Sequence, residues 1–363
     1  FPLHYKKQKK ETLIMTVRSR KLLSAILVLV MLISILPVSA FAANDSVVVI
    51  AASDYQLSNS GTIMTNIMNH IKNDFGTAYG ALLGGDYDAG SVSTKASHIQ
   101  AVDDVISGVF PEIASENRIY IQGNHENYAG LKVDGTNLMD ESGAHDTAYY
   151  GVFVINHDDF PWTTSSNPSP SEALVQKTAN ALGDYLEAKV AEGYTKPIFV
   201  TSHLPLHATT RGDNRYAKLI FDELEAAGEA GLNIIYLVGH NHSGGYDQYL
   251  GNGSFYLPEG SSLTVVEGTS GKYTDSSISF TYMNYGYLGK ISGSACTHQT
   301  MTAFEITGDQ VTIKRYAEDG VHLLKAAGVA SGSYAANTNE IGTEGAVIEL
   351  GEPEEKIEQT DNN

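Results

Sequence analysis

Five short apolar runs of this chain each end at a residue type that binds metal ions. The runs are Val47–Ser53, Ala81–Gly85, Arg118–Gln122, Pro197–Ser202 and Asn233–Val238. The residues that follow them are Asp54, Asp86, Asn124 with His125, His203, and His240 with His242. A strand that ends in such a side chain delivers it to the carboxyl-terminal edge of a sheet, where open α/β folds bind ligands. Oxygen and nitrogen donors gathered at one edge are typical of a site for two divalent metals. The pattern therefore predicts an α/β fold with a metal site and indicates an enzyme.

The same residues form an ordered series of short motifs. The series reads Asp54-Tyr55-Gln56, Gly85-Asp86, Gly123-Asn124-His125-Glu126, His203 and Gly239-His240-Asn241-His242. It resembles the calcineurin-like metallophosphoesterase superfamily, whose pattern is D-x-H, GD, GNH[D/E], H and GHxH. Each motif is weak alone, but their order behind apolar runs makes a specific combined signal across residues 46–320. The resemblance implies a four-layer α/β/β/α sandwich of two mixed sheets flanked by helices.

The resemblance also implies a ligand set and a reaction. One divalent ion is expected to bind Asp54, Gln56, Asp86 and His242, and the other Asp86, Asn124, His203 and His240, with Asp86 bridging. Mn, Fe or Zn is the expected metal, and Ca is the alternative. The implied reaction is hydrolysis of a phosphate monoester or diester by a hydroxide held between the metals. His125 is expected to act as general acid on the leaving oxygen, and Asn124 to orient a phosphoryl oxygen.

Gln56 departs from the family pattern, which usually has His at this position. Its amide oxygen is neutral and harder than an imidazole, so the first metal is expected to bind more weakly or to shift towards Mn or Ca. Alternatively, Gln56 hydrogen-bonds a metal-bound water instead of binding the metal. A different residue, Ala89, stands where purple acid phosphatases carry Tyr, which disfavours that branch of the superfamily.

Several other polar residues have two interpretations each. His207 and Arg211 lie in a predicted loop after His203 and are candidate contacts for the substrate phosphate, or simply surface residues. Glu126 either orients His125 or is a solvated acid. Asp88 is interpreted as structural because its spacing fits no ligand of the family. The stretch Tyr282–Tyr287 either stacks on a base or sugar of the substrate or packs in the core.

The amino-terminal residues predict export. Residues 1–14 precede Met15 and resemble an upstream extension. Residues 15–42 combine basic residues, the apolar stretch Leu22–Leu36 and an Ala40-Phe41-Ala42 cleavage site, which predicts a signal peptide. An uncleaved membrane anchor is the alternative, but the apolar stretch is shorter than the roughly 20 residues that a span needs. We therefore expect a secreted or cell-surface protein without a stable membrane span after cleavage.

The formal net charge of the chain is −19 at pH 7. Residues 1–42 hold seven Lys or Arg and one acidic residue, so the mature chain has a net charge of −25. So acidic a surface repels polyanions, and nucleic-acid binding is not expected. The expected partner is a small-molecule phosphate ester. Cys296 is the only cysteine, which excludes an internal disulfide.

Apolar spacing predicts the remaining organisation. Helices are expected with the apolar faces Ile63–Ile71 and Ile99–Val109, from a capping box at Ser169-Pro170-Ser171-Glu172 to Gly193, and over Tyr216–Ala227. Strands are expected at Ser254–Leu257, Leu263–Glu267 and Ile278–Met283, and as a hairpin of Met301–Ile306 with Val311–Tyr316. Residues 43–325 are interpreted as one catalytic domain. Residues 326–363 are interpreted as a flexible acidic tail or linker, compatible with a further partner domain or with attachment to a cell wall.

A non-catalytic function is the alternative interpretation. In that case the chain is a surface binding or adhesion module with a vestigial or structural metal site. The tripeptide Arg211-Gly212-Asp213 and the replacement of His by Gln56 favour it weakly. The retained His125 argues against it, because metal binding alone does not need a general acid.

Overall fold

A computed structural model describes residues 46–55, 60–88, 94–133, 138–162, 171–207, 214–240, 255–267, 272–289, 299–322, 324–326, 339–342 and 345–351. The chain separates into two compact units, Phe1–Asp45 and Ser46–Asn363, and every described residue belongs to the second. The predicted extension of residues 1–14 and the predicted signal peptide of residues 15–42 lie outside the described residues. None of the helices within the described ranges has the length and apolar character needed to cross a membrane.

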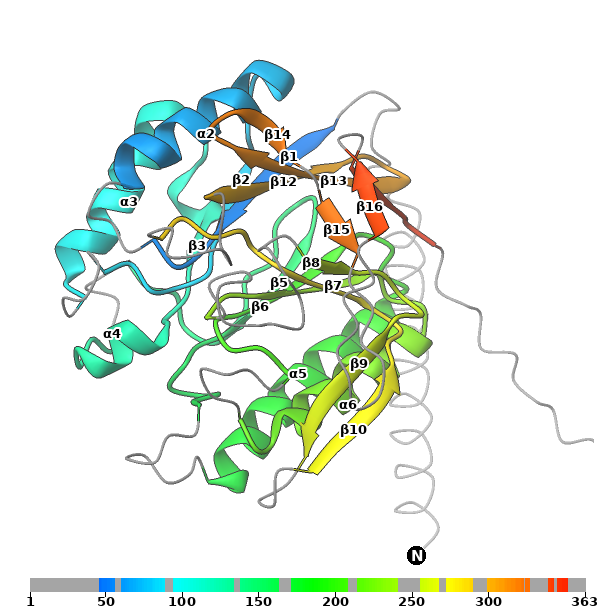
Figure 1. Cartoon of the computed structure of the whole chain (residues 1–363). Helices are drawn as coiled ribbons and strands as arrows, with labels where there is room; N and C mark the ends of the chain where they lie inside the picture. Colours follow the sequence, from blue (N-terminus) through cyan, green and yellow to red (C-terminus); the bar gives the residue numbers. More distant parts are fainter. Residues whose placement is uncertain are drawn as a thin grey trace, which may run out of the picture. The chain divides into compact units, whose positions relative to one another are not determined.

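The first sheet has the strand order β14-β13-β12-β1-β2-β3, with β17 paired to β13. The strands are β1 (Val47–Ala52), β2 (Gly80–Leu83), β3 (Arg118–Tyr120), β12 (Thr300–Ile306), β13 (Gln310–Ala317), β14 (Gly320–His322) and β17 (Ala346–Glu349). Strands β1, β2 and β3 are parallel, whereas β12 is antiparallel to β1. The sheet is therefore mixed, and its parallel half directs the ends of β1 and β2 to one edge (Figure 1).

The second sheet has the strand order β16-β15-β8-β11-β7-β6-β5-β4. The strands are β4 (Gly143–Ala144), β5 (Gly151–Ile155), β6 (Ile198–Ser202), β7 (Ile234–Val238), β8 (Phe255–Leu257), β11 (Thr281–Asn284), β15 (Leu324–Ala326) and β16 (Asn339–Gly342). Its central strands β5, β6, β7 and β11 are parallel. Beside it, β9 (Ser262–Glu267) and β10 (Lys272–Ser277) form an antiparallel pair.

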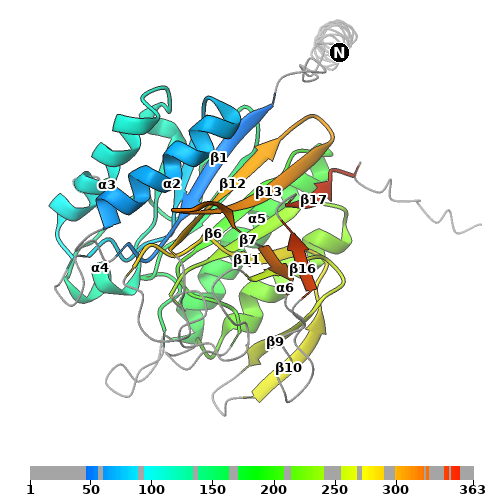
Figure 2. The same cartoon turned by 45° about the horizontal axis from the view of Figure 1, so that its top comes forward.

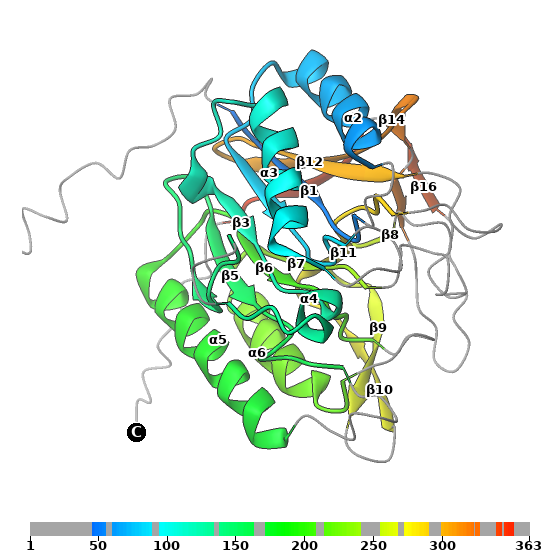
Figure 3. The ribbon, with the colours of Figure 1, turned by 90° about the vertical axis from the view of Figure 1, so that its left-hand side faces the viewer.

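Helices cover the outer faces of both sheets (Figures 2 and 3). The helices are α2 (Ser60–Phe75), α3 (Ala96–Val109), η1 (Ser115–Asn117), α4 (Asn124–Tyr128), α5 (Glu172–Glu192) and α6 (Ala217–Glu229). One apolar cluster joins α2 and α3 to the first sheet, and another joins α5 and α6 to the second. A third cluster lies between the sheets. These clusters confirm the predicted four-layer α/β/β/α sandwich.

The alternation of side chains in single strands shows why both sheets are buried on both faces. In β1, Val48 and Ile50 pack in the helix-facing cluster, whereas Val49 and Ala51 pack between the sheets. Because successive side chains of a strand point to opposite faces, a strand that is apolar at every position must be covered on both sides. The continuous apolar runs in the sequence reflect this burial.

The predicted helices form, with one shifted start. Ile99, Val102, Ile106 and Val109 are buried on α3 as the spacing predicts. Helix α5 ends at Gly193, whose φ of 68° gives the left-handed cap that glycine favours. Its amino-terminal cap is Ser171, whose Oγ accepts a hydrogen bond from Leu174 N at 3.2 Å, so the helix begins two residues later than the predicted capping box.

Two parts of the segment from residue 326, for which the composition predicts a flexible tail, form strands. Strand β16 pairs with β15, and β17 pairs with β13. In β17 the apolar residues alternate: Ala346 is buried and Ile348 packs against the inter-sheet cluster, while Val347 is 50% exposed. This short alternation is surrounded by Gly, Ser and acidic residues. The composition of the segment therefore predicts a tail and not a strand.

Candidate metal centre

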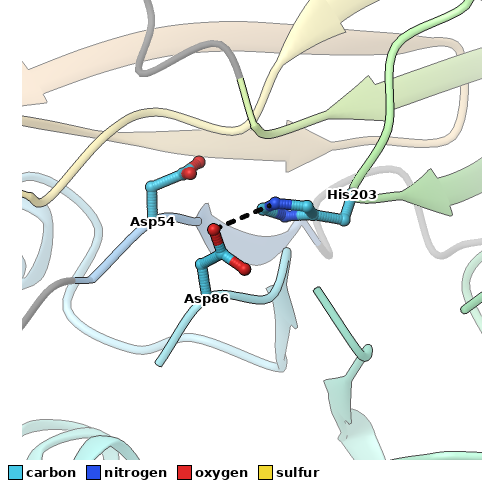
Figure 4. A group of neighbouring side chains, drawn as sticks. All are labelled: Asp54, Asp86 and His203. Atoms are coloured by element: carbon cyan, nitrogen blue, oxygen red, sulfur yellow. Dashed lines mark ion pairs between the residues drawn. The ribbon is translucent and has the colours of Figure 1, made fainter. Parts of the chain in front are cut away.

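The site lies where strands of both sheets end. Asp54 follows β1 and Asp86 follows β2 in the first sheet, whereas His203 follows β6 in the second. One ligand atom from each of these buried residues lies within 4.8 Å of the others, and Figure 4 shows the three side chains facing one another. The prediction that separate strands deliver donors to one point is confirmed for this group.

Three residues at this edge have unusual backbone geometry. The φ angles of Asp54, Asp86 and His240 are 52°, 60° and 65°. In the part of the chain that the structure describes, Leu138 is the one further non-glycine residue with positive φ. This left-handed conformation is uncommon for residues with a Cβ, and such strain concentrates at functional sites. The backbone is therefore held in a costly conformation that aims these side chains into the site.

The glycines of the motifs leave room for the ligands. A Cβ on Gly239 would lie 2.6 Å from Ser53 Oγ, 2.9 Å from His203 Nδ1 and 3.0 Å from Asp54 Oδ2. A Cβ on Gly123 would collide with Oδ1 of Asp86. Any larger residue at either position would displace the neighbouring side chains, so close packing at the site explains the glycines that precede Asn124 and His240.

Asn124 and His240 add two further candidate metal ligands to this group. Its Oδ1 lies 2.8 Å from His240 Nδ1 and 3.1 Å from His203 Nε2. His203 Nε2 in turn lies 3.2 Å from Asp86 Oδ2. Asp86, Asn124, His203 and His240, which the resemblance assigns to one metal, thus converge in the structure.

The hydrogen bond of His203 determines which of its nitrogens faces this cluster. Nδ1 lies 2.6 Å from the carbonyl oxygen of Gly84 and donates to it. In a neutral ring, Nε2 then carries no hydrogen. It faces the oxygens of Asp86 and Asn124, and these oxygens carry no hydrogen that they could donate to it. Such an arrangement requires a cation among the three atoms, either a proton on Nε2 or a metal ion. One carboxylate, one amide and two imidazoles fit a first-row divalent metal, and the Gly84 contact is the outer partner that metal-binding histidines usually have.

The charges at the site are strongly coupled. Burial tends to lower the pKa of His203, but the carboxylate of Asp86 outweighs it and raises the pKa to about 9. Burial tends to raise the pKa of Asp86, and the nearby His203 and His125 instead hold it well below its usual range. The site therefore favours an ionised Asp86 beside a positive charge.

His125 lies beside this cluster and pairs with Asp88. Its Nδ1 is 2.9 Å from Asp88 Oδ1, and its Nε2 is 3.8 Å from Asp86 Oδ2. The imidazole side chain is 27% exposed, whereas that of Asp88 is buried. Asp88 is therefore part of the site, a role that the sequence interpretation missed because the residue matches no metal-ligand spacing.

Glu126 has a role that neither sequence interpretation predicted. It is buried, and its Oε2 accepts hydrogen bonds from the backbone N of Gly123 and of Asp86, both at 2.8 Å. Its Oε1 accepts one from Tyr87 N at 2.9 Å. Burial and the charge of Asp86 raise its pKa to about 7. Glu126 ties the Asp86 loop to the Asn124 loop, so it positions backbone instead of the His125 imidazole.

The structure does not place His207 in a surface loop. Its side chain is buried, and Nδ1 lies 2.7 Å from the hydroxyl of Tyr282. Tyr282, Tyr285 and Tyr287 are likewise buried, which supports core packing over stacking on a substrate. Other predicted residues lie outside the described ranges and stay predictions; they are Gln56, Ala89, Arg211 with Gly212 and Asp213, Asn241, His242 and Cys296.

Comparison with known proteins gave matches among solved structures. A dimetal phosphatase from Danio rerio has 10% sequence identity and a TM-score of 0.45, over 80% of this chain and 99% of that one. PhoD has 10% identity and a TM-score of 0.46, over 88% of this chain and 74% of its own. GAP50, the anchor in the inner membrane complex of Plasmodium, has 12% identity and a TM-score of 0.42, over 86% of this chain and 90% of its own. No family model and no curated protein matches the sequence.

Proposed function

We propose that this chain is a calcineurin-like metallophosphoesterase that hydrolyses phosphate monoesters or diesters. The observation that carries the proposal is the convergence of Asp86, Asn124, His203 and His240 through ring nitrogens and side-chain oxygens 2.8–3.2 Å apart. The ordered motifs of the sequence support the same assignment.

The described residues suffice for most of two metal sites. One ion would bind Asp86, Asn124, His203 and His240, and the other Asp54 and Asp86 together with Gln56 and His242, which lie outside the described residues. Two divalent ions in these places would polarise phosphoryl oxygens and supply activated water at neutral pH. We expect Gln56→His to tighten the first metal or change its identity. Unchanged metal affinity in that variant would exclude Gln56 as a ligand.

The side chains around the metal ligands supply orientation and a proton. The amide of Asn124 can orient a phosphoryl oxygen. His125 is the partly exposed imidazole of the group, so it can reach the leaving oxygen of a bound ester and protonate or stabilise it. Asp88 on the opposite ring nitrogen fixes the orientation of the imidazole. In this division of roles, the buried side chains bind the metals and the partly exposed imidazole of His125 contacts the substrate.

We infer the substrate class from the charge of the chain and the location from its amino-terminal sequence. A chain as acidic as this one attracts no polyanion, so the substrate is a small-molecule phosphate ester, bound where the metal charge dominates. We further propose that the protein is exported after cleavage of residues 15–42. Cleavage after Ala42, read from the mass of the exported chain, would test this.

The experiment that tests the proposal compares two histidines of equal exposure. The imidazoles of His125 and His145 are both 27% exposed, and each lies within 4.0 Å of an aspartate. We expect His125→Ala to lower kcat by about 10²- to 10⁴-fold, as loss of a general acid does, with metal content retained. His145→Ala should keep both the kcat and the metal content of the unsubstituted chain. Full turnover in His125→Ala would contradict the assigned role, and metal binding without turnover in the unsubstituted chain would favour a binding module.

A further inference from the structure

Two aromatic side chains stand between His125 and His240, and neither has a role in the metal centre. Tyr128 is the last residue of α4 and is 57% exposed. Its ring centroid lies 6.4 Å from that of His125 and 6.1 Å from that of Trp162. The Trp162 ring lies 4.6 Å from that of His240, nearly perpendicular to it at 84°. His125, Tyr128, Trp162 and His240 thus form a continuous row of rings beside the site.

The position of Trp162 is fixed by the scaffold that also holds the metal ligands. Its backbone N donates to His157 Nε2 at 3.4 Å, and the carbonyl of the preceding Pro161 accepts from Asn214 Nδ2 at 2.6 Å. Asp158, in the same segment, donates its backbone N to Oε1 of Gln122, which directly precedes the Gly123-Asn124-His125 motif. A ring held in this way loses little conformational entropy when a ligand binds to it.

The indole of Trp162 also has an unused polar atom. Its Nε1 is buried and has no hydrogen-bond partner among the residues that the structure describes. A buried indole N–H normally finds an acceptor, so an orphan donor beside the site is a place where a ligand oxygen or ring nitrogen would bind.

The charge around Tyr128 limits what would bind there. Lys132, just beyond α4, lies 2.8 Å from Asp158, and Asn127 also donates to that carboxylate. The positive charge of Lys132 is therefore compensated. A leaving group with further phosphates would meet no excess positive charge at this pair of residues, whereas an uncharged ring would find two aromatic faces.

We propose that Tyr128 and Trp162 form a subsite for the leaving group and select phosphate esters whose leaving group carries an uncharged ring. This inference rests on the proposed function, because His125 marks the side of the leaving oxygen and Tyr128 lies three residues further along the same helix. Stacking on aromatic faces is tolerant of base identity because every base has a π-face, so a nucleobase satisfies the chemistry, and binding through the sugar instead is an outcome of the test.

The experiment compares three esters of primary alcohols, so that the reactivity of the leaving groups is similar. They are adenosine 5′-monophosphate, ribose 5-phosphate and glycerol 3-phosphate, each also tested as its methyl diester. The variants are Tyr128→Ala, Tyr128→Phe, which keeps the ring, and Leu138→Ala, a control at a residue that is 43% exposed. Trp162 is the only tryptophan of the chain, so titration with free adenosine can be followed by its fluorescence without turnover.

We expect Tyr128→Ala to lower kcat/KM for the adenosine ester by about five- to tenfold, mainly through KM, and to leave the glycerol ester unchanged. Tyr128→Phe and Leu138→Ala should behave as the unsubstituted chain. Adenosine should change the fluorescence of Trp162, and Tyr128→Ala should weaken that binding. An equal response to the ribose ester would assign the subsite to the sugar.

Other results would overturn the inference. Turnover without preference for a ring, or an equal loss for all esters in Tyr128→Ala, would remove the subsite and leave the phosphoesterase proposal intact. Absence of turnover on every ester would instead contradict the proposed function. In that case the fluorescence titration still decides the subsite, since no response to adenosine would exclude it.

Discussion

Nδ1 of His125 lies 2.9 Å from Oδ1 of Asp88. Asp88 is buried, and burial raises its pKa, while the hydrogen bond and charge of His125 lower it. The contact leaves Nε2 of His125 on the side of Asp86, at 3.8 Å from Oδ2. Asp88 thus leaves Nε2 as the ring nitrogen that would face a substrate in the proposed reaction.

The first prediction concerns this pair. Asp88→Asn keeps the shape of the side chain but removes the charge that stabilises a protonated His125. We expect kcat to fall by about 10- to 100-fold, the usual effect of losing an outer partner of a functional histidine, with metal content unchanged. Asp103→Asn is the matched control, because Asp103 pairs with Arg118 at 3.0 Å outside the site. Loss of metal together with activity in Asp88→Asn would show that Asp88 supports the metal ligands instead.

A second prediction concerns the space around Gly239. In Gly239→Ala the added methyl would meet Ser53, His203 and Asp54 at 2.6–3.0 Å. We expect a loss of about 1–3 kcal/mol in the free energy of unfolding and weaker metal binding. Gly108→Ala is the control, because a Cβ at this position of α3 meets no atom of the described residues within 4 Å. That variant should be stabilised by about 0.5–1 kcal/mol. Equal metal affinity in Gly239→Ala, measured by titration, would contradict the close packing at the site.

The pH dependence of stability gives a third prediction. Burial, assisted by the charge of His203, lowers the pKa of His157 to about 3. Between about pH 6.5 and pH 3 the unfolded chain therefore binds a proton that the folded chain does not. The contribution of His157 to stability should be complete above pH 6.5 and fall by up to about 1.4 kcal/mol per pH unit below it.

His157→Gln should weaken this pH dependence, because glutamine does not titrate. Urea unfolding at pH 7.5 and pH 5.5, with a chelator present so that metal release does not contribute, measures the effect. His70→Gln, at a partly exposed position of α2, is the control for replacing an imidazole by an amide. The same slope in His157→Gln would show that another group is responsible.

Much of the fold was predictable because the layers impose simple periods. The spacing of Ile99, Val102 and Ile106 predicted the buried face of α3, and the apolar run before Asp54 predicted β1. Short elements were missed. Strand β17 has only four residues. Its alternation of apolar and polar positions is too short a signal to predict a strand within a segment whose composition predicts a tail.

The candidate metal ligands were predictable from chemistry, since few residue types bind metals. The supporting residues were not. Asp88 and Glu126 act through contacts with residues 37 and 40 positions away, His125 and Asp86. Burial is what distinguishes Glu126 from a solvated acid, and a single sequence does not show which face of a five-residue helix is covered. The same limit applied to His207, which a predicted loop placed at the surface.

The most direct test of the central claim is a paired measurement on residues 43–363. Metal content by mass spectrometry is compared with hydrolysis of p-nitrophenyl phosphate and bis-p-nitrophenyl phosphate, before and after chelation and reloading with Mn, Fe, Zn or Ca. We predict about two metals per chain and turnover that chelation abolishes and reloading restores. Turnover that survives complete removal of metal, or bound metal without turnover on either ester under any reload, would contradict the account.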